Sequence, residues 1–85
     1  MHEDAITEQA AALRAILRRR APEIEWHTVH CVYDREAMLW VRIRAMHAER
    51  RVQFVVIVPQ PESIASSGIA ARILTEALRL LRKQN

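Results

Sequence analysis

Two alternating runs of mostly apolar residues dominate the middle of the chain. The first covers residues 37–46 and the second residues 51–58, with the polar link His47-Ala48-Glu49-Arg50 between them. Both runs are rich in β-branched and aromatic residues, which favour strands over helices. They therefore predict a long β-hairpin. Because the link contains no Asn-Gly or Asp-Gly pair, we expect a loop of about three to five residues rather than a two-residue turn.

The two faces of this predicted hairpin differ, since strand side chains alternate between faces. One set is wholly apolar and is expected to form the core: Leu39, Val41, Ile43, Ala45, Val52, Phe54, Val56 and Val58. The other set mixes apolar with basic side chains: Met38, Trp40, Arg42, Arg44, Met46, Arg51, Val55 and Ile57. A face that met only water would be more polar. This second set is therefore the predicted interface.

One amphipathic helix is predicted before the strands and one after them. Residues 4–20 carry an apolar stripe at helical spacing, and Pro22 follows as a stop signal. A proline-containing breaker at residues 59–61 precedes a broader apolar stripe that reaches the last turn at residue 83. The start of this second helix is ambiguous, because three serines could cap it: Ser63 for an early start, and Ser66 or Ser67 for a later one.

Residues 24–33 are predicted to form a further strand, although their alternation is less regular. We expect Val29 and Cys31 to face the core. In a regular strand this phase would place Trp26 on the outer face, together with Trp40.

The predicted order is helix, strand, strand, strand, helix. Short links between the strands predict a three-stranded antiparallel meander with the first arm of the hairpin in the middle. Both helices are expected on the aliphatic face, which gives a single two-layer α+β domain over residues 1–85 with one sheet face open. A chain of this size buries only about 60–65% of its unfolded surface, so contact with a partner would add to its stability.

Composition predicts a compartment. The single cysteine, Cys31, excludes an internal disulfide and fits a reducing location such as the cytoplasm. The N-terminal segment MHEDAITEQ has no apolar core, so we expect no signal peptide, and no apolar run approaches membrane-spanning length. Twelve arginines against one lysine, in an alanine-rich chain of net charge +3, are typical of a GC-rich bacterial genome. We therefore expect a cytoplasmic bacterial protein.

The histidines and the cysteine that could bind a metal ion or act in catalysis are poorly spaced for either role. His30 and Cys31 would point to opposite faces of a strand, whereas His27 and Cys31 would share a face roughly 13 Å apart. This spacing favours neither a converging zinc site nor a hydrogen-bonded Cys–His pair. Residues 66–68 could bind an anion at a helix N-terminus, but a serine cap accounts for the same residues. We expect no enzymatic activity, no metal and no cofactor.

The predicted element order resembles that of the double-stranded RNA-binding domain over nearly the whole chain. That family carries lysines at the start of its last helix, which contact phosphates. The matching residues 66–72 hold a single cation, Arg72. The family also has a Gly-Pro and His loop between its first two strands, where this chain has Asp34-Arg35-Glu36. The resemblance implies a topology, and the RNA-binding motifs do not carry over.

Contact with protein is the function that these patterns favour. Trp, Met and Arg are enriched at protein interfaces, and the predicted outer face contains all three. Two copies could stack these faces across a two-fold axis, or they could pair through a sheet edge. The predicted edges are the strand at residues 24–33 and the hairpin arm at residues 51–58. The alternative is a monomer with a face shielded by arginine stems and loops. We expect a homodimer, or docking on another protein. The second hypothesis is a nucleic-acid-binding module that uses Arg42, Arg44, Arg51 and Trp40.

Overall fold

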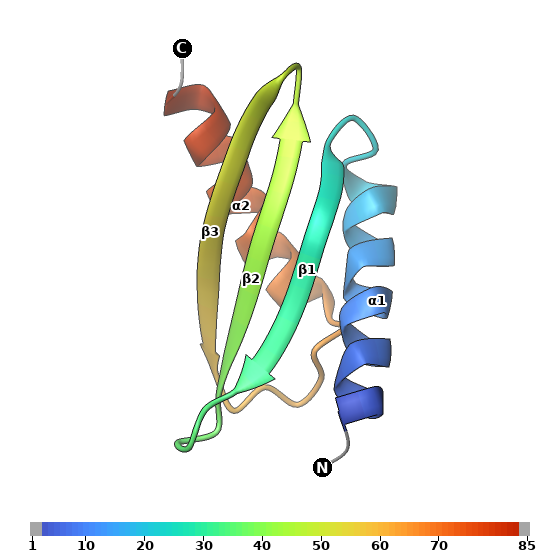
Figure 1. The fold of residues 1–85 in the computed structure, drawn as a ribbon, viewed down its shortest axis with the longest axis vertical. Coiled ribbons are helices and arrows are strands. Elements are labelled where there is room, and N and C mark those ends of the chain that lie inside the picture. The colour runs from blue at the N-terminus through green and yellow to red at the C-terminus, as the bar shows by residue number, and fades with distance from the viewer. Residues whose placement is uncertain (1–2, 84–85) are drawn as a thin grey trace.

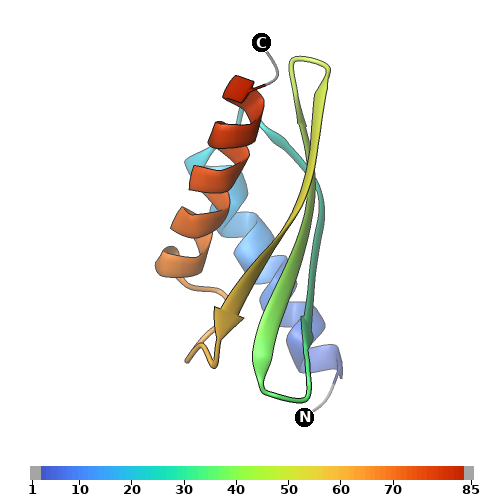
Figure 2. The same cartoon turned by 90° about the vertical axis from the view of Figure 1, so that its left-hand side faces the viewer.

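The computed structural model describes residues 3–83; Met1, His2, Gln84 and Asn85, which fall within the predicted domain, lie outside them. The elements follow one another along the chain as α1 (Glu3–Arg20), β1 (Glu25–Tyr33), β2 (Met38–His47), β3 (Arg50–Pro59) and α2 (Ser67–Lys83) (Figure 1). The strands form one antiparallel sheet in the order β1-β2-β3. Both helices lie on the same side of it, which confirms the predicted α+β meander (Figure 2).

The helices form where the apolar stripes predicted them. In α1 the stripe buries Ala10, Leu13 and Leu17. In α2 the buried residues are Ile69, Ala70, Ile73, Ala77 and Leu81. The hydroxyl of Ser66 accepts a hydrogen bond from the Ile69 N–H at 3.2 Å, so Ser66 is the N-cap and the later of the two predicted starts is correct. Among residues 3–83, neither helix has both the length and the apolar character that crossing a membrane requires.

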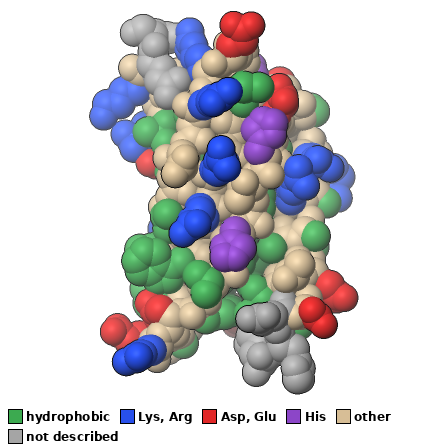
Figure 3. Space-filling view, viewed as in Figure 1, with side chains coloured by type: hydrophobic (Ala, Val, Ile, Leu, Met, Phe, Trp, Pro, Cys, Tyr) green, Lys and Arg blue, Asp and Glu red, His purple; other side chains and the backbone are tan. Residues whose placement is uncertain are grey.

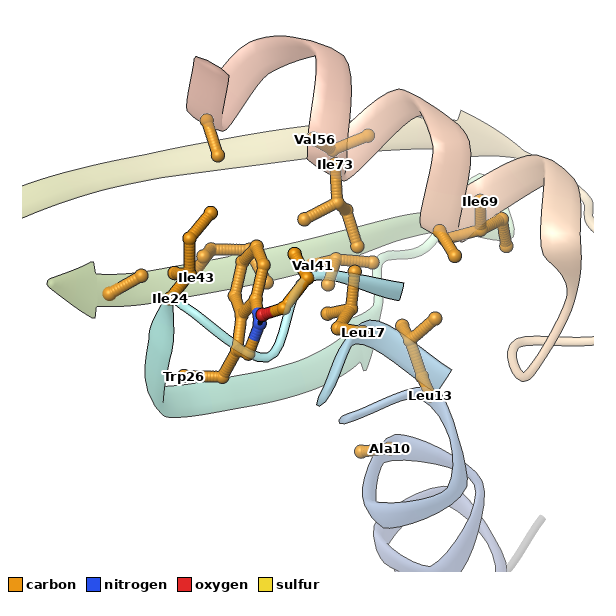
Figure 4. Packing of buried hydrophobic residues seen from close by; sticks show 14 of the residues in the cluster. Ala10, Leu13, Leu17, Ile24, Trp26, Val41, Ile43, Val56, Ile69 and Ile73 are labelled. Atoms are coloured by element: carbon orange, nitrogen blue, oxygen red, sulfur yellow. Dashed lines mark hydrogen bonds between the residues drawn. The ribbon is translucent and has the colours of Figure 1, made fainter. Parts of the chain in front are cut away.

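The core lies between the helices and the aliphatic face of the sheet. Leu39, Val41 and Ile43 of the central strand β2 are completely buried. Figure 4 shows the side chains that meet them from α1, including Leu13 and Leu17, and from α2. Burial of one such side chain contributes roughly 1.5–3 kcal/mol, so this face of the sheet accounts for much of the stability.

A β-bulge in β1 changes which residues reach the core. Trp26 lies opposite Ala45 and Thr28 lies opposite Arg44, which leaves His27 as an extra, unpaired residue. The extra residue reverses the alternation, so Trp26 and Cys31 both face the helices. The prediction that Trp26 lies on the outer face is therefore wrong. Its indole is buried and donates a hydrogen bond to the Ala21 carbonyl at 3.4 Å.

The turn between β2 and β3 is tighter than predicted. His47 pairs with Arg50, so only Ala48 and Glu49 form the turn, and the expected loop of three to five residues is wrong. Both turn residues have positive φ, 51° for Ala48 and 67° for Glu49. This is the conformation of a type I′ turn, which usually contains Asn-Gly because other residues are strained there. The right-handed twist of the two long strands favours this turn despite its sequence.

Replacing Glu49 with glycine should relieve part of this strain. We expect Glu49→Gly to raise the free energy of unfolding by about 1 kcal/mol, because a left-handed backbone costs a non-glycine residue about that much. Urea unfolding measures the difference. Glu36→Gly, in the other hairpin turn, is the matched control, since Glu36 does not have positive φ. If Glu49→Gly stabilised the protein no more than Glu36→Gly does, the inferred backbone strain at Glu49 would be contradicted.

Candidate functional site

The sheet face opposite the helices carries all the residues of the predicted interface. The strand register places them at alternate positions, facing away from the buried set: Met38, Trp40, Arg42, Arg44 and Met46 on β2, and Arg51, Val55 and Ile57 on β3. Thr28, His30 and Val32 of β1 extend the same face, because they lie opposite Arg44, Arg42 and Trp40. We call this surface the outer face; Figure 3 views it directly.

The outer face is divided along the strands into two regions. The apolar end lies next to the β1–β2 turn and consists of Val32, Met38, Trp40, Val55 and Ile57. The arginine end lies further along the strands and consists of Arg42, Arg44 and Arg51. In Figure 3, hydrophobic side chains gather in the lower part of this face and a row of basic side chains follows above them.

The apolar end concentrates the exposed hydrophobic surface of the molecule. Among residues 3–83, five large hydrophobic side chains are exposed, and four of them lie here: Val32, Trp40, Val55 and Ile57. The fifth, Leu78, lies on α2. Val32, half exposed, was missing from the predicted set. Its alternation with buried Cys31 was the signal that could have placed it there.

Asp34 fixes the orientation of Trp40 at this end. One carboxylate oxygen accepts hydrogen bonds from the N–H groups of Glu36 and Met38, at 2.8 Å and 3.0 Å. The other oxygen accepts from the indole N–H of Trp40 at 2.9 Å. The hydrogen bond from Trp40, reinforced by the two backbone N–H groups, lowers the pKa of Asp34. The indole therefore presents its apolar ring while its polar N–H is satisfied within the chain.

Two residues of the arginine end, Arg42 and Arg44, lie on the central strand, which contains no acidic residue. Two acidic residues lie near this end: Glu25, opposite Met46 at the start of β1, and Glu49, in the β2–β3 turn two residues before Arg51. Glu25 lies 3.7 Å from the imidazole of His27, which it would attract when that ring is protonated. Arg42 and Arg44 point outward from the central strand and are exposed. A partner surface that meets this end must therefore accommodate positive charge.

The residues that sequence spacing suggested for metal binding or catalysis do not converge. Cys31 is buried in the core, and burial raises the pKa of its thiol to about 11. His30 faces outward from the adjacent position, and His27 is exposed at the bulge. Within residues 3–83, no group of three His, Cys, Asp or Glu side chains is placed to hold a metal ion. The Ser66 hydroxyl already caps α2.

Comparison with known proteins supplies no relative from which a role could be carried over. No protein-family model, curated protein or solved structure matches the chain. Function must therefore be inferred from the exposed side chains themselves.

The hydrogen bond between Asp34 and Trp40 predicts a pH response. Because the folded state lowers the pKa of Asp34 below its ordinary value of 3.8, the ionised carboxylate stabilises the fold above that pH. This stabilisation is lost as the pH falls through the lowered pKa. We expect the NMR signal of the Trp40 indole N–H to titrate with a midpoint below 3.8.

The Trp26 indole is the internal control for this titration. It donates to a backbone carbonyl, so its signal should stay unchanged while the protein is folded. Asp34→Asn should abolish the Trp40 titration. A midpoint at or above 3.8 would contradict the hydrogen bond.

Proposed function

We propose that this chain is a non-catalytic protein-interaction domain that forms a homodimer through its outer face. The observation that carries the proposal is the apolar end, where exposed large side chains from all three strands adjoin one another. Contiguous apolar surface of this kind marks interaction sites in soluble proteins. Trp40 can serve as a rigid anchor there, because its indole is held by Asp34.

The size of the outer face sets the expected strength of the dimer. Strands of nine or ten residues are about 30–33 Å long, and three of them side by side give a face of roughly 500 Å². Two such faces would bury about 1,000 Å² in total, at the lower limit for a specific interface. We therefore expect a dissociation constant in the micromolar range and an equilibrium between monomer and dimer.

Charge favours one way of stacking the two copies. A two-fold axis parallel to the strands would place the arginine end of one copy on that of the other. A two-fold axis that lies parallel to the sheet but perpendicular to the strands exchanges the ends. Arg44 of one copy then approaches Trp40 and Asp34 of its mate. Cation–π contact and opposite charge both favour this second arrangement.

The proposed cellular setting is the bacterial cytoplasm. Cys31 is a free, buried thiol, which suits a reducing compartment. The predominance of arginine over lysine fits a GC-rich bacterial genome.

Sedimentation equilibrium tests the dimer. We expect the wild-type protein to associate at high micromolar concentration and Trp40→Ala to weaken association at least tenfold, because truncation removes the aromatic anchor of the apolar end. Leu78→Ala is the matched control: Leu78 is 44% exposed, against 41% for Trp40, but lies on α2. It should leave association unchanged. A wild-type protein that remains monomeric, or equal effects of the two variants, would refute the proposal.

Arg44→Glu separates the two arrangements. If the ends are exchanged, the reversed charge faces Asp34 and weakens the dimer. If arginine ends meet, a mixed dimer of the Arg44→Glu variant with the wild-type chain brings opposite charges together and is stronger than the wild-type dimer.

Binding of single-stranded nucleic acid is the second candidate, favoured by the exposed Trp40 ring beside the exposed side chains of Arg42 and Arg44 on the same strand. Stacking on an aromatic ring and neutralisation of phosphates are the interactions that such ligands use. Fluorescence anisotropy with a labelled oligonucleotide should show binding that weakens with salt. Replacing Arg42 and Arg44 by alanine should reduce the salt slope by about 0.7 for each phosphate that is no longer neutralised. Absence of binding at low salt would exclude this function.

A further inference from the structure

Each edge of the sheet is held by one arginine from the flanking helix. Arg14 of α1 donates from Nε to the carbonyl oxygen of Trp26 on β1 at 2.7 Å. Arg72 of α2 donates from Nη1 to the carbonyl oxygen of Ile57 on β3 at 3.2 Å. Both carbonyl groups must therefore point away from the central strand. Exposed backbone groups on an edge strand are a template for pairing with another chain.

The alternation of the ladder identifies the other outward-pointing groups of β1. Because the Ile57 carbonyl points away from β2, the backbone groups of its partner Trp40 face β1 and pair with Val32. The turn bonds agree, since the Met38 carbonyl accepts from Asp34 N–H on the β1 side at 3.0 Å. In an antiparallel ladder the neighbouring residues point the other way, which directs the backbone groups of Val29 and Cys31 to the free edge.

That free edge faces a groove. The groove has a volume of about 730 Å³ and is bordered by residues 28–32 of β1 and by one flank of α1. The helix lines it with small residues, Ala11 and Ala15 among them, which leave space beside the strand. Figure 1 shows α1 running alongside β1 over most of the strand. Five residues of an added strand would be about 17 Å long, which matches the bordering segment of β1.

The charge of the groove indicates what could occupy it. Its lining includes Arg14, Arg18, His27 and His30 and no acidic residue. In Figure 3, basic side chains gather on the right flank of the molecule, over α1. The β1 edge of a second copy would bring the same basic groups with it and is therefore disfavoured. An acidic segment is complementary.

We propose that this groove binds an extended acidic segment of a partner protein, which adds to β1 as a fourth strand. The backbone groups of Val29 and Cys31 supply the ladder hydrogen bonds, as in other cases of strand addition. Alternate apolar side chains of the segment pack against the alanines of α1. The acidic side chains between them lie near the basic groups of the groove. The groove shares Thr28, His30 and Val32 with the outer face, whereas its α1 flank lies outside that face.

The probe is a capped pentapeptide that alternates Glu with Val. Titration into ¹⁵N-labelled protein should shift the amide signals of residues 28–32 and of the facing part of α1, and should slow hydrogen exchange at Val29 and Cys31. A peptide with Lys in place of Glu, and one with N-methylated backbone amides, should bind at least tenfold more weakly. The first of these peptides tests the charge and the second tests the strand pairing.

Neighbouring residues of α1 offer matched variants. Ala11 and Arg18 line the groove, whereas Ala12 and Arg19, which are also exposed, do not. We expect Ala11→Leu and Arg18→Glu to weaken peptide binding at least tenfold, and Ala12→Leu and Arg19→Glu to leave it unchanged. Self-association should be the same in all four variants. A failure of peptide binding can therefore be distinguished from a failure of the proposed dimer.

Three results would overturn the proposal. They are no binding of the Glu peptide at millimolar concentration, equal binding of the N-methylated peptide, and signal shifts confined to the arginine end of the outer face.

Discussion

The one-sided burial of the central strand is the constraint on which the rest of the structure depends. Side chains of β2 alternate between complete burial at Leu39, Val41 and Ile43 and exposure at Trp40, Arg42 and Arg44. Shifting the strand by one residue would bury arginines and expose aliphatic side chains, so its register with both neighbours is strongly determined. Since the helices can cover only one side, the same alternation leaves the outer face open.

The parts of the fold that follow from simple periodicity could be predicted from the sequence. The aliphatic and mixed sets of the hairpin, the two helical stripes and the inward direction of Cys31 are all of this kind. The outer face was predicted for the same reason, because each of its β2 and β3 residues alternates with a core residue. Whether that face binds a second copy, as we propose, depends on chemistry that periodicity does not reveal.

Two features were predicted wrongly, the direction of Trp26 and the length of the β2–β3 turn. Both depend on a local irregularity of the backbone whose cost is outweighed by other interactions. The bulge at His27 has no sequence signal of its own, and the burial of Trp26 outweighs the loss of regular pairing. The turn at Ala48 and Glu49 adopts positive φ without glycine or asparagine, because ladder bonds and strand twist exceed the local strain. The groove beside β1 could not be predicted, since it depends on where α1 settles against the sheet.

The bulge also limits how the chain can change in length. In a regular strand, an inserted or deleted residue moves every later side chain to the opposite face. Here the alternation is already reversed once, at His27, and both flanking segments depend on that reversal. Deletion of this single residue would leave either Trp26 or the stretch from Val29 to Tyr33 facing the wrong way. Relatives with this core should therefore keep the number of residues between Trp26 and Cys31, while the amino acid at position 27, exposed and unpaired in the ladder, is free to vary.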